Sequence, residues 1–319
     1  MKKLDYSDMP QILQDYLKNY LIITKNRSKN TVNEYYYDLR DAFQFIKRDK
    51  YNIKVDDYKQ IDISDLDSNF FKSIEVTDIY EYLYNKHTKA ISRARKISSI
   101  KSFFNYLCNI ARIIDRNPCV SLEAPKLEKR LPKYLELDEA KSLLNSVDGE
   151  FKNRDLAILT LFLNCGLRLS ELVNINIENI RGDTLNVIGK GNKERSVHLN
   201  HACLEALSDY MKERPIDKVK SSDRNALFLS KQYKRMSPRM IEIMVKNYII
   251  KAGLDPRKYT PHKLRHTAAT LMHKYGKVDI RTLQQVLGHE TIATTQIYTH
   301  IDSEEVKNAI DNNPLNDWY

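Results

Sequence analysis

A polar, basic segment with two prolines divides this 319-residue chain into two parts. The segment, residues 123–133, also carries four basic side chains, a composition typical of an extended linker between domains. A chain of this length can form two domains, each with its own hydrophobic core. We therefore expect a first domain at residues 1–123, a linker at 124–133 and a second domain at 134–319.

The overall charge suggests a polyanionic partner, because the formal net charge is +10 and the pI is near 9.2. No apolar run approaches the roughly 18 residues that span a bilayer, and the N-terminus lacks the apolar core of a signal peptide. We expect a cytoplasmic protein that does not act at a membrane. The four cysteines lack C-x-x-C spacing, so free thiols are favoured over a disulfide or a zinc site.

Apolar residues recur at helical spacing in both parts, which predicts a mainly α fold. In the first part they predict helices at about residues 10–24, from Ser28 or Asn30 onward, at 77–85 and at 89–112. Residues 47–76 are acidic and without clear periodicity, so we expect an irregular segment that avoids DNA because like charges repel.

The predicted helix at 89–112 is the candidate DNA-binding element of the first domain. No acidic residue lies between Glu81 and Asp115, whereas seven basic ones do. Arg95, Lys96 and Ser99 fall opposite the apolar stripe, where they could contact phosphates or a groove. A solvated basic face without DNA contacts is the alternative.

In the second domain, two strands are expected at about residues 184–188 and 195–199. Glycines on both sides of Lys190 indicate a tight hairpin between them that could place the lysine in a DNA groove, although a surface hairpin with a solvated lysine is the commoner case. The fold class is therefore mainly α with a small β-hairpin. The spacing of a phosphate-binding P-loop is absent, so nucleotide hydrolysis is not expected.

Three further stretches bring cationic and nucleophilic side chains to the ends of helices. Arg168 follows Gly166 at the end of an apolar helix. Thr260 and Pro261 begin another helix, which puts His262 and Arg265 on one face near its positive end. Such an end favours an anion, most simply a phosphate. His289 follows the predicted helix end at Gly288, and Tyr298 lies nine residues beyond His289.

Read together, the order Arg168, Lys190, His262-x-x-Arg265, His289 and Tyr298 strongly resembles that of the tyrosine site-specific recombinases, and of the Xer recombinases in particular. Nearly the whole chain shares the pattern, although the acidic segment is longer than its counterpart in the most compact Xer enzymes. The resemblance implies a two-domain clamp on DNA, built from a helical core-binding domain and a catalytic domain.

The resemblance also implies a role for each member of this set. It assigns the nucleophile to Tyr298, the general acid to Lys190, the base or proton shuttle to His262, a phosphate donor to His289, and the phosphate clamp to Arg168 and Arg265. Glu171 would orient Arg168. Further DNA contacts are expected from Lys193, Lys234, Arg235 and Arg239.

The implied reaction cuts and rejoins DNA through a 3′-phosphotyrosyl bond and a Holliday junction, with neither metal, cofactor nor ATP. The implied partners are double-stranded recombination sites and three further copies of the chain in a tetramer, with room for a second recombinase or a DNA translocase. The implied task is Xer-like resolution of chromosome dimers. Integration or excision of a mobile element is the alternative.

Three other interpretations use the same residues. His262 and His266 have a zinc-like spacing, but cationic neighbours and the lack of a third ligand in a usual motif disfavour a metal site. A DNA-binding accessory protein that has lost catalysis would not need all six residues. A type IB topoisomerase shares the chemistry but fits the first domain poorly.

Overall fold

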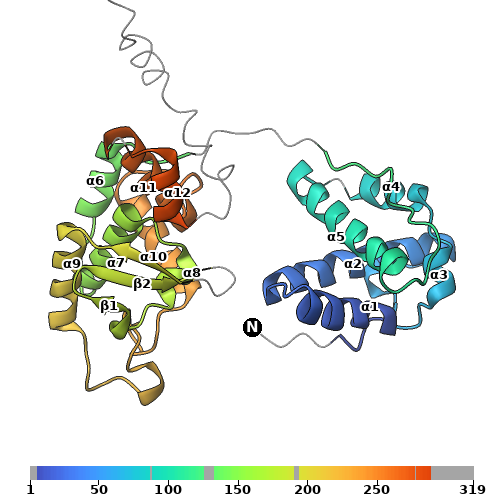
Figure 1. Ribbon diagram of the computed structural model, residues 1–319, viewed down its shortest axis with the longest axis horizontal. Helices are drawn as coiled ribbons and strands as arrows, with labels where there is room; N and C mark the ends of the chain where they lie inside the picture. The colour runs from blue at the N-terminus through green and yellow to red at the C-terminus, as the bar shows by residue number, and fades with distance from the viewer. Residues whose placement is uncertain (1–5, 87, 126–132, 190–193, 277, 289–319) are drawn as a thin grey trace, which may run out of the picture. The chain divides into compact units, whose positions relative to one another are not determined.

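The computed structural model describes residues 6–86, 88–125, 133–189, 194–276 and 278–288 (Figure 1). The chain forms two compact units, residues 1–129 and 130–319. Both are built from helices, and the second also holds a small antiparallel sheet, which confirms the predicted fold class. Every helix among the described residues is too short or too polar to cross a bilayer.

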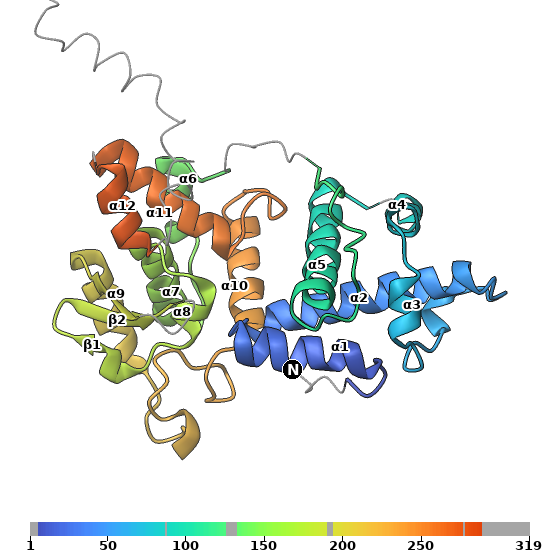
Figure 2. The same cartoon turned by 45° about the vertical axis from the view of Figure 1, so that its right-hand side comes forward.

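The first unit is entirely helical in its described residues. Its elements are α1 (Gln11–Asp15), the π-helical η1 (Tyr16–Thr24), α2 (Lys29–Lys50), the 3-10 turn η2 (Tyr58–Gln60), α3 (Ser68–Lys72), α4 (Val76–Asn85) and α5 (Ala90–Asn109). The long helix α2 begins where the Ser28 side chain accepts a hydrogen bond from the Thr31 N–H, and it packs against η1, η2, α4 and α5. Figure 2 shows α5 crossing α2.

The acidic segment is largely irregular, as predicted, but it contains the short elements η2 and α3, and its apolar residues join the core. Phe70 and Phe71 of α3 are buried, and the Phe71 ring lies 5.2 Å from that of Phe43 and 5.3 Å from that of Phe103. Asp67 begins α3 by accepting a hydrogen bond from the Phe70 N–H. The carboxylates therefore stay at the surface, where Asp57, Asp67 and Glu75 begin helices, while the aromatic rings hold the segment on the unit.

The second unit is built around one apolar helix. Its elements are α6 (Leu137–Asn145), α7 (Lys152–Cys165), α8 (Leu169–Val173), η3 (Ile177–Asn179), β1 (Ile180–Arg181), β2 (Thr184–Ile188), β3 (Glu194–His198), α9 (His201–Glu213), η4 (Ser221–Asp223), α10 (Pro238–Lys251), α11 (Pro261–Gly276) and α12 (Ile280–Leu287). Helix α7 is buried along most of its length because α6, α9 and α11 pack on it (Figure 1). The four cysteines are free thiols, as expected.

The sheet has the order β1-β2-β3, with both pairs antiparallel. The register from Thr184 opposite His198 to Ile188 opposite Glu194 confirms the two predicted strands. Strand β1 has only two residues and α9 has no counterpart among the predicted elements. Leu185, Val187 and Val197 point to the core and fix this face of the sheet inward.

Gly166 ends α7 in the left-handed conformation, with φ +58°. A Cβ at this position would come within 2.8 Å of Leu287 Cδ2 and 3.6 Å of Ala268 Cβ. The glycine therefore serves two purposes, since it lets the chain turn and lets α11 and α12 approach the end of α7.

We expect Gly166→Ala to lower the free energy of unfolding by more than Gly182→Ala, measured by urea denaturation. Gly182 has a nearly equal φ, +59°, but nothing lies within 4 Å of a Cβ built there. Gly182→Ala should cost only the left-handed strain, about 1–2 kcal/mol. Gly166→Ala should add the displacement of Leu287. Equal losses would contradict close packing at Gly166.

Candidate active site

Arg265 joins the ends of two helices in the interior of the second unit. Its Nη1 donates to the carbonyl of Gly166 at 2.6 Å, and its Nη2 donates to the carbonyl of Leu287 at 2.5 Å. The side chain is only 4% exposed. Both acceptors lie at helix C-termini, where carbonyls lack helical partners and carry the negative end of the helix dipole. The guanidinium is therefore held where backbone geometry favours a cation.

Arg168 lies close by, at the start of α8, and is more open to solvent. Its backbone N–H and its Nη1 donate to the two oxygens of Glu171, at 2.8 and 2.6 Å. Its Nη2 donates to the carbonyl of Gly288 at 2.9 Å. The side chain is 30% exposed, while that of Glu171 is completely buried. Glu171 thus holds the backbone and the side chain of Arg168 while part of the guanidinium stays at the surface.

A third arginine, Arg195, completes the cluster and was not predicted from the sequence. Its Nη2 lies 2.9 Å from Glu171 Oε2, and its Nη1 donates to the carbonyl of Val286. Arg265 Nη1 also lies 3.7 Å from Glu171 Oε2. The only signal in the sequence is its place in the Gly-Lys-Gly-Asn-Lys-Glu-Arg string, which identifies a strand residue but not the carboxylate it meets.

We call Arg168, Glu171, Arg195 and Arg265 the arginine cluster. Three positive charges against one negative leave an excess of two positive charges, which suits an anion. Burial by itself would raise the pKa of Glu171, but the Arg168 N–H and the guanidinium groups of Arg195 and Arg168 outweigh it, and the pKa is lowered. The carboxylate therefore stays ionised and keeps the cations together.

His262 comes from the first turn of α11, which begins at Pro261 as predicted. Its Nε2 lies 3.1 Å from His266 Nε2, and the two rings are nearly perpendicular at 79°. Burial of the ring and the cations Lys263, Arg265 and Arg168 lower the pKa of His262. A neutral imidazole near neutral pH can accept a proton, which suits a base or a shuttle.

Four of the predicted site residues lie outside the described residues: Lys190, Lys193, His289 and Tyr298. Within the part of the chain that the structure describes, no three His, Cys, Asp or Glu side chains gather as a metal site would require. The structure therefore brings together four of the predicted catalytic and supporting residues: Arg168, Glu171, His262 and Arg265.

Comparisons with known proteins cover both units. Residues 133–305 match the phage integrase family, and residues 13–109 match the N-terminal SAM-like domain of phage integrases. The chain is 51% identical to the tyrosine recombinase XerC of Caldanaerobacter subterraneus subsp. tengcongensis, over 99% of this chain and 89% of that protein. It is 34% identical to the tyrosine recombinase XerD of Staphylococcus epidermidis, over 94% of this chain and 97% of that protein.

The chain belongs to the phage integrase family of tyrosine recombinases. This confirms the family that the order of the six candidate residues predicted, and the likeness to Xer enzymes within it. A solved structure with the same fold is the XerH site-specific recombinase in a post-cleavage complex with a palindromic difH substrate. Its TM-score is 0.70 at 20% identity, over 94% of this chain and 83% of that one.

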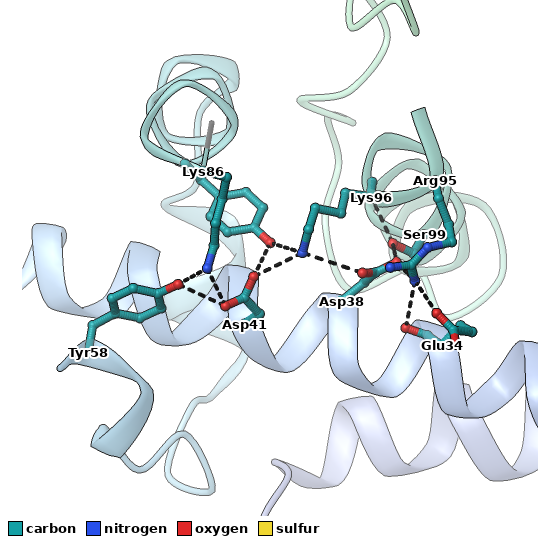
Figure 3. Close-up of polar contacts among 9 residues, drawn as sticks. Glu34, Asp38, Asp41, Tyr58, Lys86, Arg95, Lys96 and Ser99 are labelled. Carbon is teal, nitrogen blue, oxygen red and sulfur yellow. Dashed lines mark hydrogen bonds and ion pairs between the residues drawn. The ribbon is translucent and has the colours of Figure 1, made fainter. Parts of the chain in front are cut away.

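In the SAM-like domain of this tyrosine recombinase, two of the three predicted DNA contacts are internal. Ser99 is fully buried and donates to Asp38 Oδ2 at 3.2 Å. Lys96 is 9% exposed and lies 2.9 Å from Asp41 Oδ2 and 3.4 Å from Asp38 Oδ1 (Figure 3). Their predicted surface placement is wrong, because α2 presents two carboxylates to α5.

The two carboxylates belong to a larger set of polar side chains, which we call the Asp38–Asp41 network (Figure 3). Its members are Glu34, Asp38, Asp41, Tyr58, Tyr82, Lys86, Arg95, Lys96 and Ser99. Arg95 lies at its edge, bonded to Asp38 at 2.5 Å and to Glu34 at 2.7 Å, and keeps 40% of its side chain exposed. Of the three predicted contacts, Arg95 alone has a surface that DNA could reach in this conformation.

The remaining predicted DNA contacts of the recombinase also differ from one another. Arg235 donates to the carbonyls of Val173 and Ile175 and to Asn176 Oδ1, so it cross-links the backbone after α8. The side chain is half-buried, so its predicted role as a DNA contact stays a prediction beside this structural one. Lys234 and Arg239 are exposed. The Arg239 side chain keeps 79% of its surface and lies 3.5 Å from Glu242, so its prediction stands as a proposal.

We expect Lys96→Met to destabilise the protein without changing the salt dependence of DNA binding. Losing charged hydrogen bonds should cost about 1.5–3 kcal/mol in thermal or urea unfolding. Each phosphate contact contributes about 0.9 to the slope of log K against log salt, so an unchanged slope would indicate no contact. Arg239→Ala is the matched exposed variant and should lower that slope. A lower slope in Lys96→Met would restore the original prediction.

The proton affinity of His262 gives a second prediction. Its folded pKa is lowered, so NMR titration of labelled histidine should give a midpoint below the ordinary value of about 6.5. His262 then contributes stability above the unfolded value, which is lost as the pH falls toward the folded value. Lys263→Met removes the nearest cation in sequence and should raise the midpoint. A midpoint above 6.5 in the free wild-type protein would contradict this environment.

Proposed function

We propose that this recombinase cuts and rejoins DNA at specific sites through a covalent bond between Tyr298 and the 3′ phosphate of the cut strand. The observation that carries the proposal is the arginine cluster, in which Arg168 and Arg265 are preorganised beside a buried carboxylate. Preorganised cations stabilise the charge that develops on the nonbridging oxygens of a phosphate under attack. Arginine suits this better than lysine because its fork matches two oxygens.

The proposed cleavage forms one bond and breaks one. The Tyr298 oxygen attacks phosphorus and loses its proton, for which His262 is the candidate acceptor. The bond from phosphorus to the 5′ oxygen breaks, and Lys190 donates the proton that the leaving oxygen requires. His289 donates a hydrogen bond to the phosphate. The product is again a phosphodiester, so attack by a 5′ hydroxyl of another strand reverses the step with little change in energy.

Exchange between two sites requires this step on several strands, so we propose a tetramer that passes through a Holliday junction. The likeness to proteins named XerC and XerD supports a task of that kind, and we propose resolution of chromosome dimers in the cytoplasm. A second recombinase or a DNA translocase would act on the same assembly. Sequencing the DNA recovered with the cross-linked protein would test this task, since sites within a mobile element would contradict it.

Tyr298→Phe tests the central step. We expect the variant to form no covalent product on a nicked suicide substrate, because the nucleophilic oxygen is gone. Its affinity for the same DNA should stay within about twofold, because the interactions that bind substrate and transition state equally are unchanged. Denaturing gel electrophoresis detects the protein–DNA adduct. EDTA should leave the wild-type yield unchanged. Adduct formation by Tyr298→Phe, or none by the wild type on any recombination site, would overturn the proposal.

A further inference from the structure

Arg195 is the member of the arginine cluster to which the proposed reaction gives no task. It lies on β3, and its guanidinium reaches two different elements. One nitrogen bonds to Glu171 on α8 at 2.9 Å, and the other donates to the carbonyl of Val286 near the end of α12. The Arg195 side chain thus joins strand β3 to helices α8 and α12.

The direct pairing of Arg195 with Glu171 indicates that it supports the site, whereas burial alone does not, because Arg265 is buried more deeply still. Only 13% of its side chain is exposed, and both Nη atoms are already bonded to protein acceptors. A charge buried in this way is stable only beside a paired carboxylate or equivalent acceptors. Its two acceptors, the Glu171 carboxylate and the Val286 carbonyl, therefore make Arg195 part of the support of the site.

The backbone around Arg195 is fitted to it. Gly288 ends α12 with φ +63°, and a Cβ there would come within 2.7 Å of Arg195 Cδ. The same Gly288 offers its carbonyl to Arg168 at 2.9 Å. The aliphatic part of the Arg195 side chain thus lies against Gly288, whose carbonyl holds Arg168. The guanidinium of Arg195 bonds to Glu171, which also bonds to Arg168.

Removing Arg195 would take one positively charged partner away from Glu171, and the carboxylate would then attract the remaining cations more strongly. Glu171 Oε2 now accepts from the Arg168 N–H and from Arg195, with Arg265 at 3.7 Å. Without Arg195, the next guanidinium near this oxygen is that of Arg265, whose Nη1 already lies 3.7 Å away. Closing that distance would draw Arg265 away from the carbonyls of Gly166 and Leu287. The position of Arg265 relative to Arg168 would then change.

We propose that Arg195 is a positioning residue that fixes Arg168 and Arg265 through Glu171 and the end of α12. The proposal rests on the proposed function, because it concerns the phosphate that those arginines would bind. A lysine at 195 could keep the charge beside Glu171 but could not also reach Val286 with a second nitrogen, since it lacks the guanidinium fork. Its effect should be intermediate.

The first test compares single-turnover cleavage of a suicide substrate at saturating protein. We expect Arg195→Ala to slow cleavage by roughly 10- to 100-fold, because misplacing a reacting group by about 1 Å can cost about 10²-fold in rate. Its DNA affinity should change far less, and Arg195→Lys should lie between it and wild type. If Arg195→Ala does not fold, as judged by thermal unfolding, Arg195→Lys carries the comparison.

Arg214 provides the matched control. It is 5% exposed and donates only to backbone carbonyls, those of Arg224, Ala226 and Leu227. Arg214→Lys should lower stability but leave cleavage by the folded protein at the wild-type rate. Equal slowing by Arg214→Lys and Arg195→Lys would mean that general loss of stability explains both, and would overturn the positioning role.

A double-mutant cycle tests whether Arg195 acts through Glu171. Residues that act as one unit give strongly non-additive effects. Arg195→Ala combined with Glu171→Gln should therefore cleave hardly more slowly than Glu171→Gln alone. Independent, multiplied effects would contradict the proposal.

A substrate with sulfur in place of the bridging 5′ oxygen distinguishes loss of the proton donor from loss of the phosphate-binding arginines. A thiolate leaves without a proton, so this substrate should rescue Lys190→Ala but not Arg195→Ala. Rescue of Arg195→Ala would assign the residue to the proton donor and overturn its role at the arginines. Failure of wild-type protein to cleave either substrate would instead overturn the proposed function, so the two failures are distinguishable.

Discussion

The second unit depends on one buried carboxylate among three guanidinium groups. Like charges repel strongly in a medium of low dielectric constant, and Glu171 offsets this repulsion because it pairs with all three cations. The ends of α7 and α12 contribute further, because their last carbonyls are acceptors without helical partners. Cationic side chains near a helix C-terminus can donate to its last carbonyls. Here, α12 receives three, at Val286, Leu287 and Gly288.

The two arginines of the proposed phosphate clamp differ in burial and in structural role. Arg265 is buried and ties the helices together, whereas Arg168 retains exposed surface. A guanidinium carries five N–H donors, so structural bonds to two carbonyls do not exhaust it. An arginine can therefore hold the fold and meet an anion at once, which a lysine with its single nitrogen does less well.

The features that the sequence predicted well are local ones. The start of α11 at Pro261, the glycine ends of α7 and α12, and the β2–β3 pair each follow from a few adjacent residues. The features that it missed depend on residues far apart in the chain. Ser99 and Lys96 are buried because Asp38 and Asp41 face them from α2, 61 and 55 residues earlier. A polar stripe on one helix does not disclose such a partner, although two acids three apart beside an apolar face of α2 are a usable sign.

The missed role of Arg195 has the same origin, because its acceptors lie 24 and 91 residues away. The packing of the acidic segment against the core was missed for another reason. Its charges dominate the composition, but they cap short helices at the surface while Phe70 and Phe71 fill the core. Net charge describes the outside of a segment and says little about the few rings that hold it in place.

The Asp38–Asp41 network has a consequence for how the SAM-like domain opens. Asp41 alone accepts from Tyr58 of η2, Tyr82 of α4, Lys86 beyond α4 and Lys96 of α5. Detaching any one of these elements leaves a partly buried charge with fewer partners, so fraying of single helices is discouraged. Amide hydrogens in α2, α4 and α5 should therefore exchange with solvent as one cooperative unit rather than helix by helix.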